Sequence, residues 1–233
     1  MRRLILFLIF SLPAVACLAQ SDSTRSAPVT DTVTRIASIA PADHQVRFGF
    51  DISRIAFNLA NTSRYSYEMQ ADYSRNAKLY MVAEAGWGGS TTDYEHLKYK
   101  GSNFFLRAGV DQSLLDRMGL TDFDMAFLGI RYGIGLGNRS EASFLVPSPF
   151  GPPAQGTEPA ESYIVHWGEV TAGVKVEMWK GFFAGWNMRM KFLLNPGRFE
   201  RLSPSYIAGY GKGDKTTAFD FNFYLSYALR WKR

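Results

Sequence analysis

Apolar and polar residues alternate strictly in the last third of the chain. Trp186, Met188 and Phe192 occupy one set of alternating positions, and Arg189 and Lys191 occupy the other. A period of two is that of a β-strand, because successive side chains of a strand point to opposite faces. This segment therefore predicts a strand with one apolar face and one charged face.

The same alternation predicts eight strands along the chain. In the first strand the apolar phase breaks after Ile52 and resumes at Ile55, which we interpret as a β-bulge near Ser53 and Arg54. The predicted strands cover residues 46–59, 65–73, 79–87, 104–111, 126–136, 169–178, 182–194 and 219–231.

The connections between the predicted strands alternate in length, apart from a brief first outer link near 61–63. Those at 74–77 and 179–181 are short, and those at 88–98, 138–162 and 195–215 are long. Short turns at one end and long loops at the other are typical of transmembrane β-barrels, which have an even number of antiparallel strands. The pattern predicts an all-β protein, an eight-stranded antiparallel transmembrane up-and-down β-barrel.

Alternation alone does not show which face is inside, because a soluble lipocalin-like barrel also alternates. Three features favour a membrane barrel: an apolar phase without charges in the last four strands, aromatic residues at strand ends, and glycines on the polar phase, where a narrow lumen benefits from missing side chains. The aromatic residues are Trp87, Tyr163, Trp167, Trp179, Tyr227 and Trp231, and the glycines are Gly129, Gly133, Gly135, Gly173 and Gly185.

The apolar face is therefore predicted to contact lipid and the polar face to line the lumen. The interior of an eight-stranded barrel is just wide enough for side chains to fill, and buried charges are tolerated when they are paired. We expect a filled, ion-paired lumen and no water-filled pore. The predicted lipid-facing residues are Trp186, Met188, Met190, Phe192, Phe219, Phe221, Phe223 and Leu225. The predicted lumen network has seven basic and eight acidic residues: Arg47, Arg107, Arg131, Lys175, Arg189, Lys191, Arg230, Asp51, Glu68, Asp72, Glu84, Asp111, Glu169, Glu177 and Asp220.

Three parts are predicted along the chain. Residues 1–19 combine two arginines, a short apolar core and small residues near Ala19, which is the pattern of a secretory signal peptide. Residues 20–44 have little periodicity and predict a flexible periplasmic leader, and residues 45–233 form the barrel. The residues before Cys17 resemble a lipoprotein processing site, so the sequence leaves open whether Cys17 is lipidated or removed with the signal peptide.

The formal net charge of +5 does not indicate nucleic-acid binding, because the basic residues are mixed with carboxylates and do not gather on one surface. No paired histidines or cysteines have a metal-ligand spacing. The glycine-rich segment 209–216 lacks both the glycine before Lys215 and the following helix of a phosphate loop. We expect no cofactor, no metal and no nucleic-acid partner.

His166 is the strongest candidate for chemistry, because some outer-membrane barrels act on lipid with a histidine beside a hydroxyl and a carboxylate. Ser162 and Glu169 lie near it in the sequence, but Gly168 stands where outer-membrane lipid deacylases carry a serine. We interpret His166 as a histidine of the interfacial aromatic belt and expect no catalytic residue. A lipid-modifying enzyme is the alternative.

Segments 82–88, 107–115, 129–133, 166–194 and 206–212 resemble an uncharacterised family of small bacterial outer-membrane β-barrel proteins, a domain of unknown function. The resemblance covers nearly the whole folded region and implies an outer-membrane barrel. It implies no activity, because none is assigned to the family.

Together these patterns predict a non-enzymatic outer-membrane barrel with a structural or surface-interaction role in the cell envelope. The expected partners are outer-membrane lipid, an extracellular partner at the Pro-rich loop 138–162, and the outer-membrane assembly machinery, which would recognise the aromatic strand ending near Trp231. A narrow channel or a carrier for small apolar molecules is a further alternative.

Overall fold

The structure is a computed structural model that describes residues 44–74, 76, 78–116, 122–148, 151–199 and 201–231. The predicted signal peptide, Cys17 and nearly all of the predicted leader lie outside the described residues. In chain order the elements are β1 His44–Asp51, α1 Ile52–Ala60, β2 Arg64–Ser74, β3 Leu79–Tyr94, β4 Leu97–Ser113, β5 Met125–Arg139, β6 Ala142–Val146, β7 Ala154–Glu158, β8 Glu161–Trp179, β9 Phe182–Leu193, the 3₁₀ helix η1 Pro196–Arg198 and β10 Thr217–Trp231.

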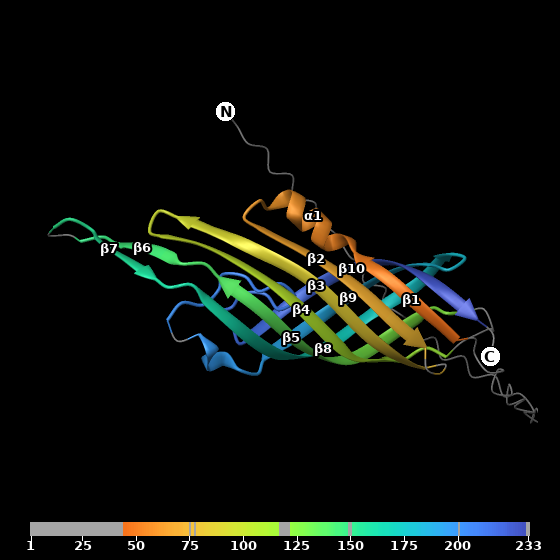
Figure 1. Ribbon diagram of the computed structural model, residues 1–233. Coiled ribbons are helices and arrows are strands. Elements are labelled where there is room, and N and C mark those ends of the chain that lie inside the picture. Colours follow the sequence, from red (N-terminus) through yellow and green to blue (C-terminus); the bar gives the residue numbers. More distant parts are fainter. Residues whose placement is uncertain are drawn as a thin grey trace, which may run out of the picture. The chain divides into compact units, whose positions relative to one another are not determined.

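Eight of these strands form a closed barrel (Figure 1). The order around the ring is β1, β2, β3, β4, β5, β8, β9 and β10, and β10 pairs again with β1. Every neighbouring pair in the ring is antiparallel. The prediction of an eight-stranded antiparallel barrel is confirmed.

The prediction for the first strand is wrong beyond Asp51, where the chain enters helix α1. The Asp51 side chain caps the helix by accepting a hydrogen bond from the Ser53 amide at 2.9 Å. Ile52, Ile55 and Leu59 are separated by three and four residues, which is the spacing of one helix face. The change of phase therefore marks the start of a helix and not a β-bulge.

Two long connections also differ from the prediction. β3 and β4 pair as far as Tyr94↔Leu97, so a turn at 95–96 replaces the predicted link at 88–98. The connection 138–162 contains the β6–β7 hairpin, and β6 pairs with β4 through Leu97↔Phe144. Figure 1 shows this hairpin projecting past the other strands. We call this end of the barrel the loop end, and the end with the tight turn between β8 and β9 the turn end.

The two faces of the barrel wall differ in chemistry. The predicted lipid-facing residues all lie on the exterior, where six are exposed and Met190 and Phe223 are half-buried between neighbours. Most charged side chains of the opposite phase are buried inside, including Arg47 and Arg189. Among the described residues no helix has the length and apolar character needed to cross a membrane.

Candidate functional site

The lumen is the candidate site, and its centre is an ion-pair cluster around Glu84. The Glu84 carboxylate pairs with Arg107 at 2.6 Å, with Arg189 at 2.7 Å and with Arg131. Glu68 and Glu169 complete the cluster by pairing with Arg107, Glu169 at 3.1 Å. All of these side chains are fully buried, so each charge depends on its partners for stabilisation.

Further ion pairs continue the network toward both ends. Toward the turn end, Asp72 pairs with Arg47 at 2.6 Å and with Lys175 at 2.8 Å. Near the strand termini there, Arg230 pairs with Glu177 at 2.6 Å. The network therefore runs through the lumen and does not form one isolated cluster.

The structure brings all the predicted lumen residues into at least one ion pair each. The sequence analysis missed Arg54, which projects inward from α1 and pairs with Asp220 and, at 3.3 Å, with Asp51. Arg54 adds an eighth positive charge to the seven predicted ones and so balances the eight predicted carboxylates. Helix spacing from Asp51 was the signal that could have identified it.

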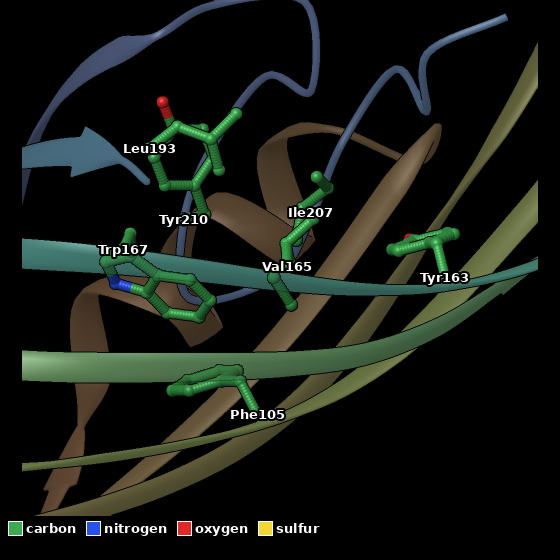
Figure 2. Packing of buried hydrophobic residues seen from close by; sticks show 8 residues of the cluster. Phe105, Tyr163, Val165, Trp167, Leu193, Ile207 and Tyr210 are labelled. Carbon is green, nitrogen blue, oxygen red and sulfur yellow. The ribbon is translucent and has the colours of Figure 1, made fainter. Parts of the chain in front are cut away.

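An apolar layer covers the ionic network on the side of the loop end. Trp167, Phe105 and Tyr210 lie near one another in this layer (Figure 2). The ring centroids of Trp167 and Phe105 are 6.4 Å apart, and those of Trp167 and Tyr210 are 5.8 Å apart. The Trp167 indole also donates to Glu169 Oε1 at 2.6 Å, which joins the two layers. The buried members of the layer are Phe105, Tyr163, Val165, Trp167, Leu193, Ile207, Ala208 and Tyr210.

The prediction that Trp167 and Tyr163 belong to an interfacial aromatic belt is wrong, because both are buried in the lumen. Both have the same parity as Glu169 on β8, and that face points inward. Their place near a strand end favours the interface, whereas their parity indicates the lumen. Trp87, Trp179, Tyr227 and Trp231 are exposed on the exterior.

The loop between β9 and β10 folds into the mouth of the barrel as a plug. Its Gly209 carbonyl accepts hydrogen bonds from Arg107 Nη1 at 3.1 Å and Lys191 Nζ at 2.7 Å. The Asn103 side chain holds both the amide and the carbonyl of Ala208, at 2.8 and 3.0 Å. The sequence analysis treated this segment only as a loop, because contacts between residues more than 100 positions apart leave no local pattern.

His166 and Glu169, which the sequence places close together, lie on opposite faces of the barrel wall. His166 lies on the exterior phase and its Nδ1 is 2.9 Å from the Tyr132 hydroxyl, whereas Glu169 points into the lumen. The His44 ring stacks with the rings of Tyr73 and Trp231 near the turn end. Within the described ranges, no group of three or more His, Cys, Asp or Glu side chains is arranged to hold a metal ion.

The family model for the Domain of unknown function (DUF6048) matches residues 1–232. The chain belongs to the DUF6048 family. This match confirms the family resemblance seen in the sequence. No curated protein matches this DUF6048 member.

Among solved structures, the DUF6048 barrel is similar to Ail, the attachment invasion locus protein of Yersinia pestis. The two chains share 8% identity, with 82% of this chain and 99% of Ail covered and a TM-score of 0.40. This level of likeness carries neither a ligand nor a role from Ail to the DUF6048 chain.

Proposed function

We propose that this protein is a small outer-membrane β-barrel with a filled, ion-paired lumen, which serves a structural or surface-interaction role in the cell envelope and has no enzymatic activity. The observation that carries the proposal is the distribution of side chains across the barrel wall. Large apolar residues cover the exterior, and the charged residues of the same strands pair inside. In water this exterior would be a very large exposed apolar surface, whereas in a bilayer it is solvated by acyl chains.

The test is the location and folded behaviour of the full chain. We expect it to fractionate with the outer membrane and to migrate differently on gels before and after heating, as a folded barrel resists detergent unfolding. A full chain that stays dissolved as a compact monomer without detergent would overturn the proposal. Binding to the outer-membrane assembly machinery through β10, whose exterior carries Tyr227, Leu229 and Trp231, is part of the same proposal.

The β6–β7 hairpin is the proposed site for an extracellular partner. It is held to the wall by the pairs Leu97↔Phe144 and Lys98↔Ser143, and it exposes Phe144 and Val146. Exposed apolar residues on a projecting connection are typical of contact surfaces.

Surface display of the chain on cells tests this site. Phe144→Ser with Val146→Ser is expected to lower cell adhesion while leaving the heat-dependent gel shift unchanged. Val176→Ser with Met178→Ser removes two exposed apolar residues near the turn end and is the matched control. If cell adhesion is equal in the two double variants, the hairpin is not the contact site for an extracellular partner.

A further inference from the structure

The barrel wall has a seam at the loop end, between β2 and β10. β1 pairs with β2 only as far as Phe50↔Met69 and with β10 only as far as Asp51↔Tyr224. Residues 64–68 of β2 and 217–223 of β10 continue past these points without β1 between them. Helix α1 contacts both strands and lies along this interval (Figure 1). In this interval α1 therefore takes the place in the wall that a strand occupies in the rest of the barrel.

The Asn58 side chain of α1 bonds to the β2 edge of the seam. Asn58 Nδ2 donates to the Ser66 carbonyl at 2.9 Å, and Asn58 Oδ1 accepts from the Ser66 amide at 2.9 Å. The side-chain amide of Asn58 thus bonds to the N–H and C=O of Ser66, the two backbone groups that a neighbouring strand would otherwise have paired. On the exterior, α1 exposes Ile55, Phe57 and Leu59, the last of them 83% exposed. Ile55 and Leu59, four residues apart, share one side of the helix, and Phe57 lies on another, so the seam presents several exposed apolar side chains to the surroundings of the barrel.

A cavity of about 310 Å³ lies at the seam beside α1 and β10. The charged residues of its lining are Arg54, Arg64, Lys212, Lys215 and Asp220, which makes four basic side chains and one carboxylate. Phe219, which is 74% exposed, also lines the cavity and joins it to the apolar exterior. Basic side chains and the exposed apolar surface of Phe219 therefore lie side by side at this cavity.

The basic residues of this cavity differ from those of the lumen in their partners. Asp220 is already paired with Arg54 and with Lys191, at 2.6 Å for Lys191. Among the described residues Lys215 forms one ion pair, in which its Nζ lies 4.0 Å from Asp214. For Arg64 and Lys212, no carboxylate in the described part of the chain lies within 4.0 Å. Arg64 instead lies over the Tyr206 ring, 5.6 Å from its centroid, which holds the guanidinium at the cavity.

We propose that this seam binds one phosphate-bearing lipid from the leaflet at the loop end, with the phosphate in the cavity and the acyl chains along α1 and Phe219. This inference rests on the proposed function, in which the barrel is inserted in a membrane. A guanidinium presents a planar pair of donors that matches a phosphate, and lysines add positive charge around it. An anion without acyl chains would leave the exposed apolar side chains of α1 without a partner, whereas a lipid contacts both these side chains and the basic residues.

Native mass spectrometry of the folded full chain tests the inference, with phosphatidic acid and phosphatidylcholine of the same acyl chains as probes. The wild type is expected to retain one phosphatidic acid per chain in preference to phosphatidylcholine. Arg64→Ala with Lys212→Ala is expected to weaken this binding at least about tenfold, since two charge-assisted contacts to the phosphate are lost. Arg54 is left intact because it belongs to the ion-pair network.

Lys100→Ala with Lys180→Ala is the matched control, because it removes two exposed lysines that do not line the cavity. This control is expected to bind phosphatidic acid as the wild type does. An equal loss of phosphatidic acid binding in the two double variants would mean that the lipid is attracted by the positive charge of the whole protein. That result would overturn the proposal.

A second pair of measurements separates a lipid from free phosphate. Phe57→Ser with Leu59→Ser is expected to weaken phosphatidic acid binding, because the acyl chains lose their apolar surface. If that variant binds normally and inorganic phosphate displaces the lipid, the site takes free phosphate and the lipid proposal is wrong. The heat-dependent gel shift is recorded on the same samples. If the protein shows the gel shift but no preference for phosphatidic acid, only this inference is wrong. If the protein never inserts into a membrane, the proposed function is wrong.

Discussion

The indole ring of Trp167 fills the space that a side chain at Gly133 would occupy, since a Cβ atom added to Gly133 would overlap that ring. The two residues face each other on neighbouring strands, β8 and β5, in register. A missing side chain on one strand thus accommodates the largest side chain on the next. The lumen of this narrow barrel is packed by such pairings as well as by charge.

Gly133→Ala is therefore expected to lower the free energy of unfolding by about 1–3 kcal/mol, the typical cost of overpacking. Trp167 has little freedom to move away, because its indole donates to Glu169 at 2.6 Å. Gly168→Ala is the control, since a Cβ atom at Gly168 meets nothing within 4 Å. Urea unfolding in lipid vesicles, followed by tryptophan fluorescence, measures both variants. Equal unfolding midpoints would contradict the packing argument.

Glu84→Gln is expected to destabilise the folded barrel by about 3–5 kcal/mol, because it leaves buried arginine charge without compensation. Glu84 is the shared partner of Arg107, Arg131 and Arg189. The same change at Glu158, whose partner Arg201 is largely exposed, is expected to cost less than about 1 kcal/mol. The unfolding free energies of the two variants are compared in the same vesicles. A similar cost at both positions would show that the central cluster does not hold the lumen together.

Met188→Lys tests whether the exterior contacts lipid. Met188 is 57% exposed near the middle of β9, and Leu194, just past its end, is 58% exposed. A lysine at the membrane midplane costs about 2–4 kcal/mol, whereas one near the interface costs about 0–1 kcal/mol. We therefore expect Met188→Lys to impair folding into vesicles much more than Leu194→Lys, as measured by the fraction with the heat-dependent gel shift. In a soluble barrel both lysines would be tolerated, and that result would reverse the assignment of the faces.

The filled lumen predicts little or no current in planar bilayers. Replacing residues 203–212 by a short Gly-Ser linker removes the plug, together with the carbonyl that accepts from Arg107 and Lys191. We expect this variant to conduct little as well, because the Glu84 cluster still blocks the lumen beneath the plug. Stable current steps from the wild type would favour the channel alternative, and steps from the variant alone would make the plug the gate.

Much of the candidate site could be predicted from residue parity alone. Asp220, Arg189 and Lys191 fall on the charged phase of their strands, and each of them points into the lumen. The errors on the inward face come from position along the strand and not from parity. Trp167 was assigned to a membrane interface because of its place near a strand end, although its parity with Glu169 puts it inside.

The sequence by itself determined the barrel, the number of strands in its ring and the face on which most strand residues lie. These properties follow from a period of two, which is local and is read from neighbouring positions. Only the tertiary structure decided that Arg189 meets Glu84 across 105 positions, that residues 207–210 plug the mouth, and that α1 replaces a strand at the seam. Closing the ring brings distant strands together, and the volume left inside selects which loop and which side chains fill it.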